Sequence, residues 1–126
     1  MDSFSEIMNK DCTVYKTADF IGKKWTIPLI LELYKGEDHS KRYSELKRDL
    51  LKITPKILSA RLKELEKEEL ISKDVDSTTF PPRCTYSLTK SGKDFIPVIQ
   101  GIKTWSLRWK DSDKVCKSTD CFKCEL

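Results

Sequence analysis

The chain has 126 residues and a net charge of +4. Charged residues make up 35% of it and hydrophobic residues 38%, a composition that supports one small core rather than two domains. No apolar run approaches the roughly 18 residues of a membrane span. The opening residues also lack the charged-then-apolar order of a signal peptide. We therefore expect a cytoplasmic protein with one domain over residues 1–110 and a short tail over 111–126.

The first predicted elements are two helical segments within TADFIGKKWTIPLILELYKG, residues 17–36. A break is expected near Gly22 or Pro28, and Pro28 suits the first turn of the second segment. Gly36 predicts the end of that segment. The EDHSKR that follows is expected to be a polar loop.

A short amphipathic helix is predicted from RYSELKRDLL, residues 42–51, with Ser44 as its candidate cap. Its apolar positions recur at helical spacing: Tyr43, Leu46 and Leu50. After a tight connection, Thr54 as N-cap and Pro55 at the first helical position predict the start of a longer helix.

The pattern changes to a strand-like period after residue 70. ISKDV and CTYSL are short β-like runs, and the two prolines of DSTTFPPR between them suit a loop. Cys84 shares a face with Tyr86 and Leu88, which predicts a buried, unreactive thiol. A final helix is predicted over residues 89–110. The order of these elements predicts a mainly α fold with a small β-hairpin, a winged helix-turn-helix.

The longer helix has two different faces. One is apolar, and Arg61 at its edge is expected to be a structural ion-pair partner. The opposite face is small or basic: Lys56, Ser59, Ala60, Lys63 and Lys67. A helix in the DNA major groove needs small residues for close approach, short polar groups for base edges and cations for phosphates. The face therefore favours DNA, and a solvated charged surface is the alternative.

Further candidate DNA contacts flank this helix. Thr54 and the helix N-terminus can bond a phosphate, and Ser44 is expected to do so from the short helix. Arg83, beside the two prolines, is expected either to reach an adjacent minor groove or to stay in solvent. Nine basic and four acidic side chains between residues 41 and 67 give this segment a charge of +5, the electrostatic footprint of a polyanion partner.

These residues resemble the HxlR-type winged-helix transcriptional regulators, a branch near the MarR-type proteins. The resemblance covers about residues 12–109, and its stretches follow the family's order: IGKKWTIPLILELYKG, RYSELKRDL, ITPKILSARLKELEKEELI, PPRCTYSLTKSG and the late Trp105. It implies a homodimeric regulator that binds double-stranded DNA at an inverted-repeat operator, and we expect a repressor. Lys23, Cys84 and Thr85 depart from the family's usual pattern, away from the predicted reading face.

Members of this family are similar in dimerising through their terminal helices. The last predicted helix carries an apolar stripe that a small monomer would struggle to cover. The predicted dimer interface is therefore Phe95, Ile99, Ile102, Trp105 and Trp109.

Cys12 is the redox-sensing candidate. It lies at the predicted start of the first helix and near lysines, a setting in which reactive thiols occur. Several proteins that the chain resembles have a cysteine at this place that senses oxidants or electrophiles. A partly buried, inert thiol is the alternative. The inducer, a small molecule or an oxidant, is not defined by the sequence.

The tail KVCKSTDCFKCEL lies outside the resemblance. Cys116, Cys121 and Cys124 share the C-x4-C-x2-C spacing of plant-type iron–sulfur proteins, but a cluster needs a fourth thiolate. His39 is a candidate to complete a zinc site with them. We expect free thiols or a disulfide and no cofactor. A redox or metal-binding winged-helix protein, or a protein-interaction module, is the alternative function. No nucleophile–histidine pairing or glycine-rich phosphate loop supports an enzyme.

Overall fold

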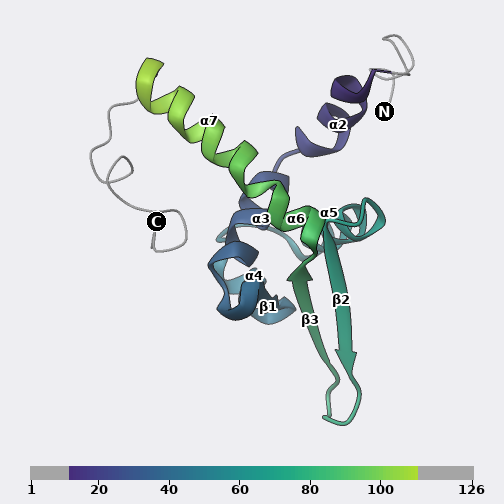
Figure 1. The fold of residues 1–126 in the computed structure, drawn as a ribbon. Coiled ribbons are helices and arrows are strands. Elements are labelled where there is room, and N and C mark those ends of the chain that lie inside the picture. The colour runs from purple at the N-terminus through teal and green to yellow at the C-terminus, as the bar shows by residue number, and fades with distance from the viewer. Residues whose placement is uncertain (1–11, 111–126) are drawn as a thin grey trace.

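The computed structural model describes residues 12–110, and Figure 1 shows how their elements are arranged. Helices gather at the centre, a long β-hairpin projects to one side, and two helices diverge on the other side (Figure 1). In chain order the elements are α2 (Thr13–Ile21), α3 (Thr26–Lys35), the 3-10 turn η1 (Glu37–His39), β1 (Ser40–Arg42), α4 (Tyr43–Asp49), α5 (Pro55–Lys67), β2 (Ile71–Asp76), β3 (Arg83–Leu88), α6 (Lys90–Asp94) and α7 (Ile96–Trp109).

The predicted hairpin is confirmed as β2 and β3, which pair antiparallel from Ile71 opposite Leu88 to Asp76 opposite Arg83. We call this hairpin, residues 71–88, the wing. A third strand was not predicted: β1 pairs antiparallel with β3, so the sheet order is β1-β3-β2. The expectation of a loop throughout EDHSKR was therefore wrong. Ser40–Arg42 has no β-branched or aromatic residue to indicate a strand, and its pairing partner lies more than 40 residues away.

Most predicted helix boundaries are confirmed. The first two segments break at Gly22, and Pro28 lies in the first turn of α3. The α5 helix begins as expected, because Thr54 Oγ1 accepts a hydrogen bond from the backbone N–H of Ile57 at 3.2 Å, and Pro55 is the first helical residue.

Two boundary predictions were wrong. Ser44 does not cap α4, which begins one residue earlier, at Tyr43; the backbone N–H of Arg42 instead donates to the Glu45 carboxylate at 2.8 Å. The single final helix is divided at Phe95 into α6 and α7. Gly92 in α6 lies against the end of α5 and the start of β2: a Cβ there would stand 2.2 Å from the carbonyl oxygen of Leu70, so only glycine allows this approach.

The core is built around α3. Its leucine and isoleucine side chains pack with the apolar faces of α4 and α5 and with the inner face of the sheet. The most buried large side chains are Leu29, Ile30, Leu33, Leu46, Leu58, Leu62, Leu65 and Ile71. This core holds α4 and α5 in a fixed relative position, which is the condition for presenting one face of α5 outward.

An ion-pair network also joins α3 to α4. Lys41 donates to a Glu32 carboxylate oxygen at 2.9 Å and to Asp49 at 2.7 Å. Burial disfavours the charge of Lys41, but its hydrogen bonds to Asp49 and Glu32 outweigh burial and raise the pKa of Lys41. Burial likewise opposes the charge of Asp49, yet hydrogen bonds from Lys41 and Arg48 lower the pKa of Asp49. Lys41 thus has a structural role, although it was included among the basic residues of the segment predicted to face a polyanion.

Candidate DNA interface

The two faces of α5 have the exposures that the sequence predicts. Leu58, Leu62 and Leu65 are at most 2% exposed and lie in the core. The residues of the opposite face are all exposed: Lys56, Ser59, Ala60, Lys63 and Lys67. We call these five residues the reading face. Its charge and its small central side chains fit the width and chemistry of a major groove.

The three lysines of the reading face, Lys56, Lys63 and Lys67, form no ion pair with any of residues 12–110. Arg61 differs from them, as expected. Its Nε donates to the carbonyl oxygen of Lys24 at 2.9 Å, and its Nη1 lies 3.4 Å from a Glu64 oxygen. Within α5, the positive charge that can meet phosphate is therefore on the outer side of the helix.

Hydroxyl groups border the reading face at its N-terminal end. Thr54 uses its oxygen as an acceptor for the cap, so its hydroxyl proton can still be donated to a phosphate. Tyr43 packs partly against the core, and its hydroxyl lies 3.4 Å from the hydroxyl of Ser59. Ser44, at the start of α4, is exposed. The start of α4 and the reading face are thus joined through a side-chain contact.

The wing carries Arg83 at the first position of β3, where its side chain is exposed. The preceding turn is stabilised by Asp76, whose carboxylate accepts hydrogen bonds from the hydroxyl and the backbone N–H of Thr78. These hydrogen bonds hold the pKa of Asp76 below its usual range. Phe80, within the turn, is 99% exposed.

Figure 1 shows that α2 and α7 diverge from the centre on the side opposite the tip of the wing. Of the five residues predicted to form a dimer interface, Ile102, Trp105 and Trp109 are 48%, 56% and 65% exposed. Phe95 and Ile99 instead pack into the chain's own core, and Ile99 is only 4% exposed. The structure adds two exposed apolar residues that sequence reasoning missed: Val98 on α7 and Val14 on α2.

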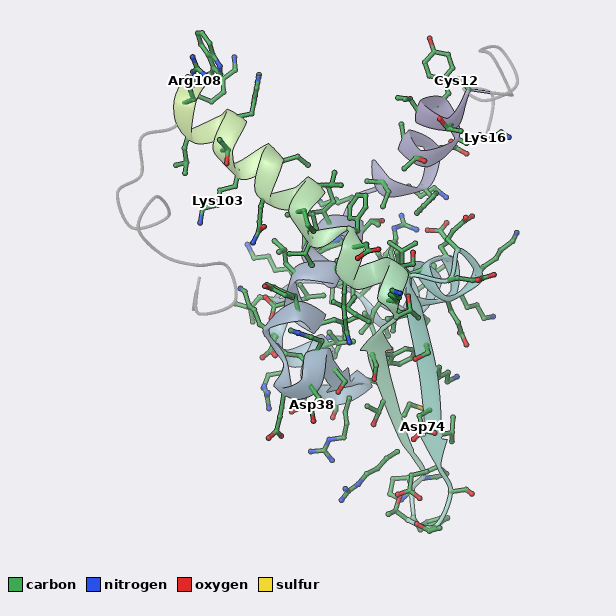
Figure 2. All side chains as sticks on the ribbon, in the orientation of Figure 1. Cys12, Lys16, Asp38, Asp74, Lys103 and Arg108 are labelled. Carbon is green, nitrogen blue, oxygen red and sulfur yellow. The ribbon has the colours of Figure 1, made fainter. Side chains whose placement is uncertain are left out.

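Cys12 occupies the N-cap position of α2 and is half-buried, and its carbonyl oxygen accepts from the backbone N–H of Lys16 at 3.0 Å. Figure 2 shows both residues on this helix, far from Asp74 on the wing. Cys84 is half-buried against the core rather than fully enclosed, which corrects the expectation of a buried thiol. Both of these cysteines are free thiols.

The predicted tail ligands Cys116, Cys121 and Cys124 lie outside the described residues. The ring of His39 stacks on Tyr34 with 4.9 Å between centroids. Its Nδ1 lies 2.9 Å from the carbonyl oxygen of Tyr34. Within residues 12–110, no cluster of three histidine, cysteine or acidic side chains is arranged to hold a metal ion. Over the same residues, no helix is long and apolar enough to cross a membrane.

Comparison with known proteins agrees with this architecture. The chain is 38% identical over 96 residues to the uncharacterised HTH-type transcriptional regulator YvaP of Bacillus subtilis strain 168, covering 76% of this chain and 85% of YvaP. The reduced form of the regulator YodB from B. subtilis superposes with a TM-score of 0.69 at 29% identity, over 82% of this chain and 98% of YodB. The redox regulator HypR in its oxidised form superposes with a TM-score of 0.67 at 33% identity, over 79% of this chain and 99% of HypR.

The basic outer face of α5, the helix that precedes it and the wing within a three-stranded sheet define a winged helix-turn-helix protein of the DNA-binding class. The model of the HxlR-like helix-turn-helix family matches residues 20–114, which is most of the chain. The chain belongs to this family and is a DNA-binding transcriptional regulator of the HxlR type, not an enzyme.

Proposed function

We propose that the protein is a sequence-specific repressor that binds an inverted-repeat operator as a homodimer. The observation that carries the proposal is the reading face of α5, where three lysines with no ion pair to residues 12–110 surround Ser59 and Ala60. Ala60 and Ser59 let the helix approach the bases, and Ser59 offers a hydroxyl to a base edge. Lys56, Lys63 and Lys67 meet the phosphates that border the groove.

The dimer follows from the exposed apolar side chains of α2 and α7. Val14, Val98, Ile102, Trp105 and Trp109 are each about half exposed or more, and a second copy of the chain is the partner that would cover them. In such a dimer the two reading faces are related by a twofold axis. They would enter successive major grooves about 34 Å apart, which requires an inverted repeat.

Thiol chemistry at Cys12 is the proposed control of this activity. Cys12 lies on α2, which also carries part of the proposed dimer contact, and α2 packs on α3 at the centre of the fold. The similar protein HypR is a redox regulator, and YodB has a reduced form. Addition of an electrophile to the Cys12 sulfur would displace α2 and thereby bias the dimer toward an arrangement that binds the operator less well.

The test of DNA recognition begins by selecting an operator from random duplexes. Fluorescence anisotropy then measures its affinity over a range of salt concentrations. Lys63→Ala is expected to weaken binding to every sequence, and to flatten the slope of log K against log salt by about 0.9 for each phosphate that the variant no longer neutralises. Lys93→Ala is the matched control, because Lys93 is an exposed lysine on α6. The α6 helix follows the end of β3 that lies away from the wing turn. An unchanged slope for Lys63→Ala would show that Lys63 does not meet phosphate.

The test of thiol control compares the reduced protein with protein treated with a quinone, in wild type and Cys12→Ser. We expect the quinone to lower operator affinity for the wild type only, while Cys84→Ser, the control, responds as the wild type does. Equal loss of affinity in wild type and Cys12→Ser would remove Cys12 from the mechanism.

A further inference from the structure

A hollow of about 460 Å³ lies between the start of α4 and the turn at the tip of the wing. Arg42, Tyr43 and Ser44 line one side, and residues 79–84 of the wing line the other. The hollow therefore has two arginines and several hydroxyl groups in its walls, and no carboxylate side chain. Phe80, Pro81, Pro82 and Cys84 add apolar surface, and the two arginines supply the charge that an anion requires.

The sheet places the two arginines as neighbours. Arg42 on β1 is directly opposite Thr85 on β3, and Arg83 is two residues before Thr85 on the same strand. Directly opposed residues, and alternate residues of one strand, share a face of the sheet. Arg42 and Arg83 are therefore diagonal neighbours on one face, with backbones roughly 7–8 Å apart. At that separation, two guanidinium groups can reach one phosphate from opposite sides.

Neither arginine is committed to a strong partner within residues 12–110. The Nε of Arg42 is 4.0 Å from a Glu45 oxygen, the outer limit of an ion pair, and nearly half of the Arg42 side chain is exposed. Arg83 forms no ion pair with the described residues, although Asp76 lies opposite it on β2. The Asp76 carboxylate is instead hydrogen-bonded to Thr78. Both guanidinium groups are thus able to bind an incoming anion.

The nearby acids also indicate which anion the hollow would accept. Glu45 beside Arg42, and Asp74 and Asp76 on the wing face of Arg83, oppose a small dianion that diffuses in alone. A phosphodiester carries a single charge, and DNA already held by α5 presents it at high effective concentration. The contact between Tyr43 and Ser59 places the hollow next to the reading face.

We propose that this hollow is a seat for one DNA phosphodiester, which is clamped between Arg42 and Arg83. The phosphodiester belongs to the DNA strand that separates the major groove entered by α5 from the minor groove beside the wing. This inference rests on the proposed function and deepens it. It assigns a DNA contact to Arg42. It also predicts that Arg83 contacts the DNA backbone rather than the bases of the minor groove. The seat fixes the position of α5 along the groove without reading sequence.

The test uses the full chain and operator duplexes in which single phosphates are replaced by uncharged methylphosphonates. For the wild type, one replacement in each half-site should weaken binding through the loss of this seat. Arg42→Ala and Arg83→Ala should both become insensitive to that same replacement. The double variant should lose little more affinity than either single variant, because both side chains bind one group. Each variant should weaken binding to operator and to random DNA by the same factor.

Two results would overturn the seat. If Arg42→Ala and Arg83→Ala become insensitive to the replacement of two different phosphates, the two arginines make separate contacts. A change in base preference beside the half-site for Arg83→Ala, with an unchanged salt slope, would show that Arg83 reads the minor groove. Arg42→Gln repeats the test with a side chain that keeps much of the length and polarity, and circular dichroism confirms folding of each variant.

Lys63→Ala and Lys93→Ala, measured in parallel, separate this inference from the proposed function. If Lys63→Ala flattens the salt slope while both arginine variants behave like Lys93→Ala, the regulator stands and the seat is wrong. If Lys63→Ala also behaves like Lys93→Ala, the phosphate contact proposed for α5 at Lys63 is wrong. Flattened slopes for all three interface variants, with a shared phosphate for the arginines, support both.

Discussion

Lys41 is the residue whose replacement tests the internal architecture most directly. Its ammonium joins Glu32 on α3 to Asp49 at the end of α4, and its side chain is only 14% exposed. Lys41→Met keeps the aliphatic stem and removes both charge-assisted hydrogen bonds. Removing one partner of an exposed ion pair costs at most about 1 kcal/mol, whereas removing one partner of a fully buried pair costs about 3–5 kcal/mol, because the other charge is left without compensation. For this partly buried triad we expect the free energy of unfolding to fall by about 2 kcal/mol.

Urea unfolding at fixed protein concentration measures this loss. With a slope of about 1 kcal/mol per molar urea, a loss of about 2 kcal/mol lowers the midpoint by about 2 M. Lys23→Met is the matched control, because the Lys23 side chain pairs with Glu64 but is 42% exposed. The control should change the free energy of unfolding by less than about 1 kcal/mol.

The pH dependence follows from the direction of the pKa shift of Asp49. Because folding lowers this pKa, the Lys41–Asp49 interaction is fully present above the ordinary value of 3.8 and is lost as the pH falls through the folded value. The difference in stability between wild type and Lys41→Met should therefore narrow in acid. Equal midpoints at pH 7, or a difference that is unchanged well below pH 3.8, would refute the role assigned to Lys41.

Three further outcomes are expected. Trp105→Ala on α7 should weaken the dimer by about 2 kcal/mol, or about 30-fold, in sedimentation equilibrium; unchanged association would place the interface elsewhere. Thr54→Ala should lower the free energy of unfolding by about 1 kcal/mol in urea, and Thr54→Ser should restore it, because α5 loses its cap and then regains it. Asp74→Asn should strengthen binding to all DNA at low salt and less so at high salt, because it removes a carboxylate from the wing face of Arg83. Equal or weaker binding would contradict that charge argument.

Local signals in the sequence predicted α5, the wing and the reading face. The start of α5 is set by Thr54 and Pro55, which act within one turn of the chain, and its burial follows a simple period. Alternation along β3 likewise placed Tyr86 and Leu88 in the core. Each of these features depends on neighbours in sequence, so a single chain is enough to predict it.

The features that were missed depend on residues distant in sequence. β1 exists because β3 offers it an edge, and this pairing is what makes Arg42 a neighbour of Arg83. The apolar stripe of the last segment appeared continuous, yet Ile99 faces the chain's own core because α7 starts a new helix after Phe95. Lys41 likewise has the charge of a DNA-binding residue, and only its two partners show its structural role.

The sheet order β1-β3-β2 leaves one side of β2 without a partner strand among residues 12–110. A projecting strand with an open side is a template on which copies of a protein can aggregate, and charged side chains oppose this. β2 carries Lys73, Asp74 and Asp76, all exposed, along that strand. The acids that are expected to weaken the attraction between the wing and DNA would therefore also keep wings apart at high concentration. A wing evolved only for tighter DNA binding would lose part of the protein's solubility.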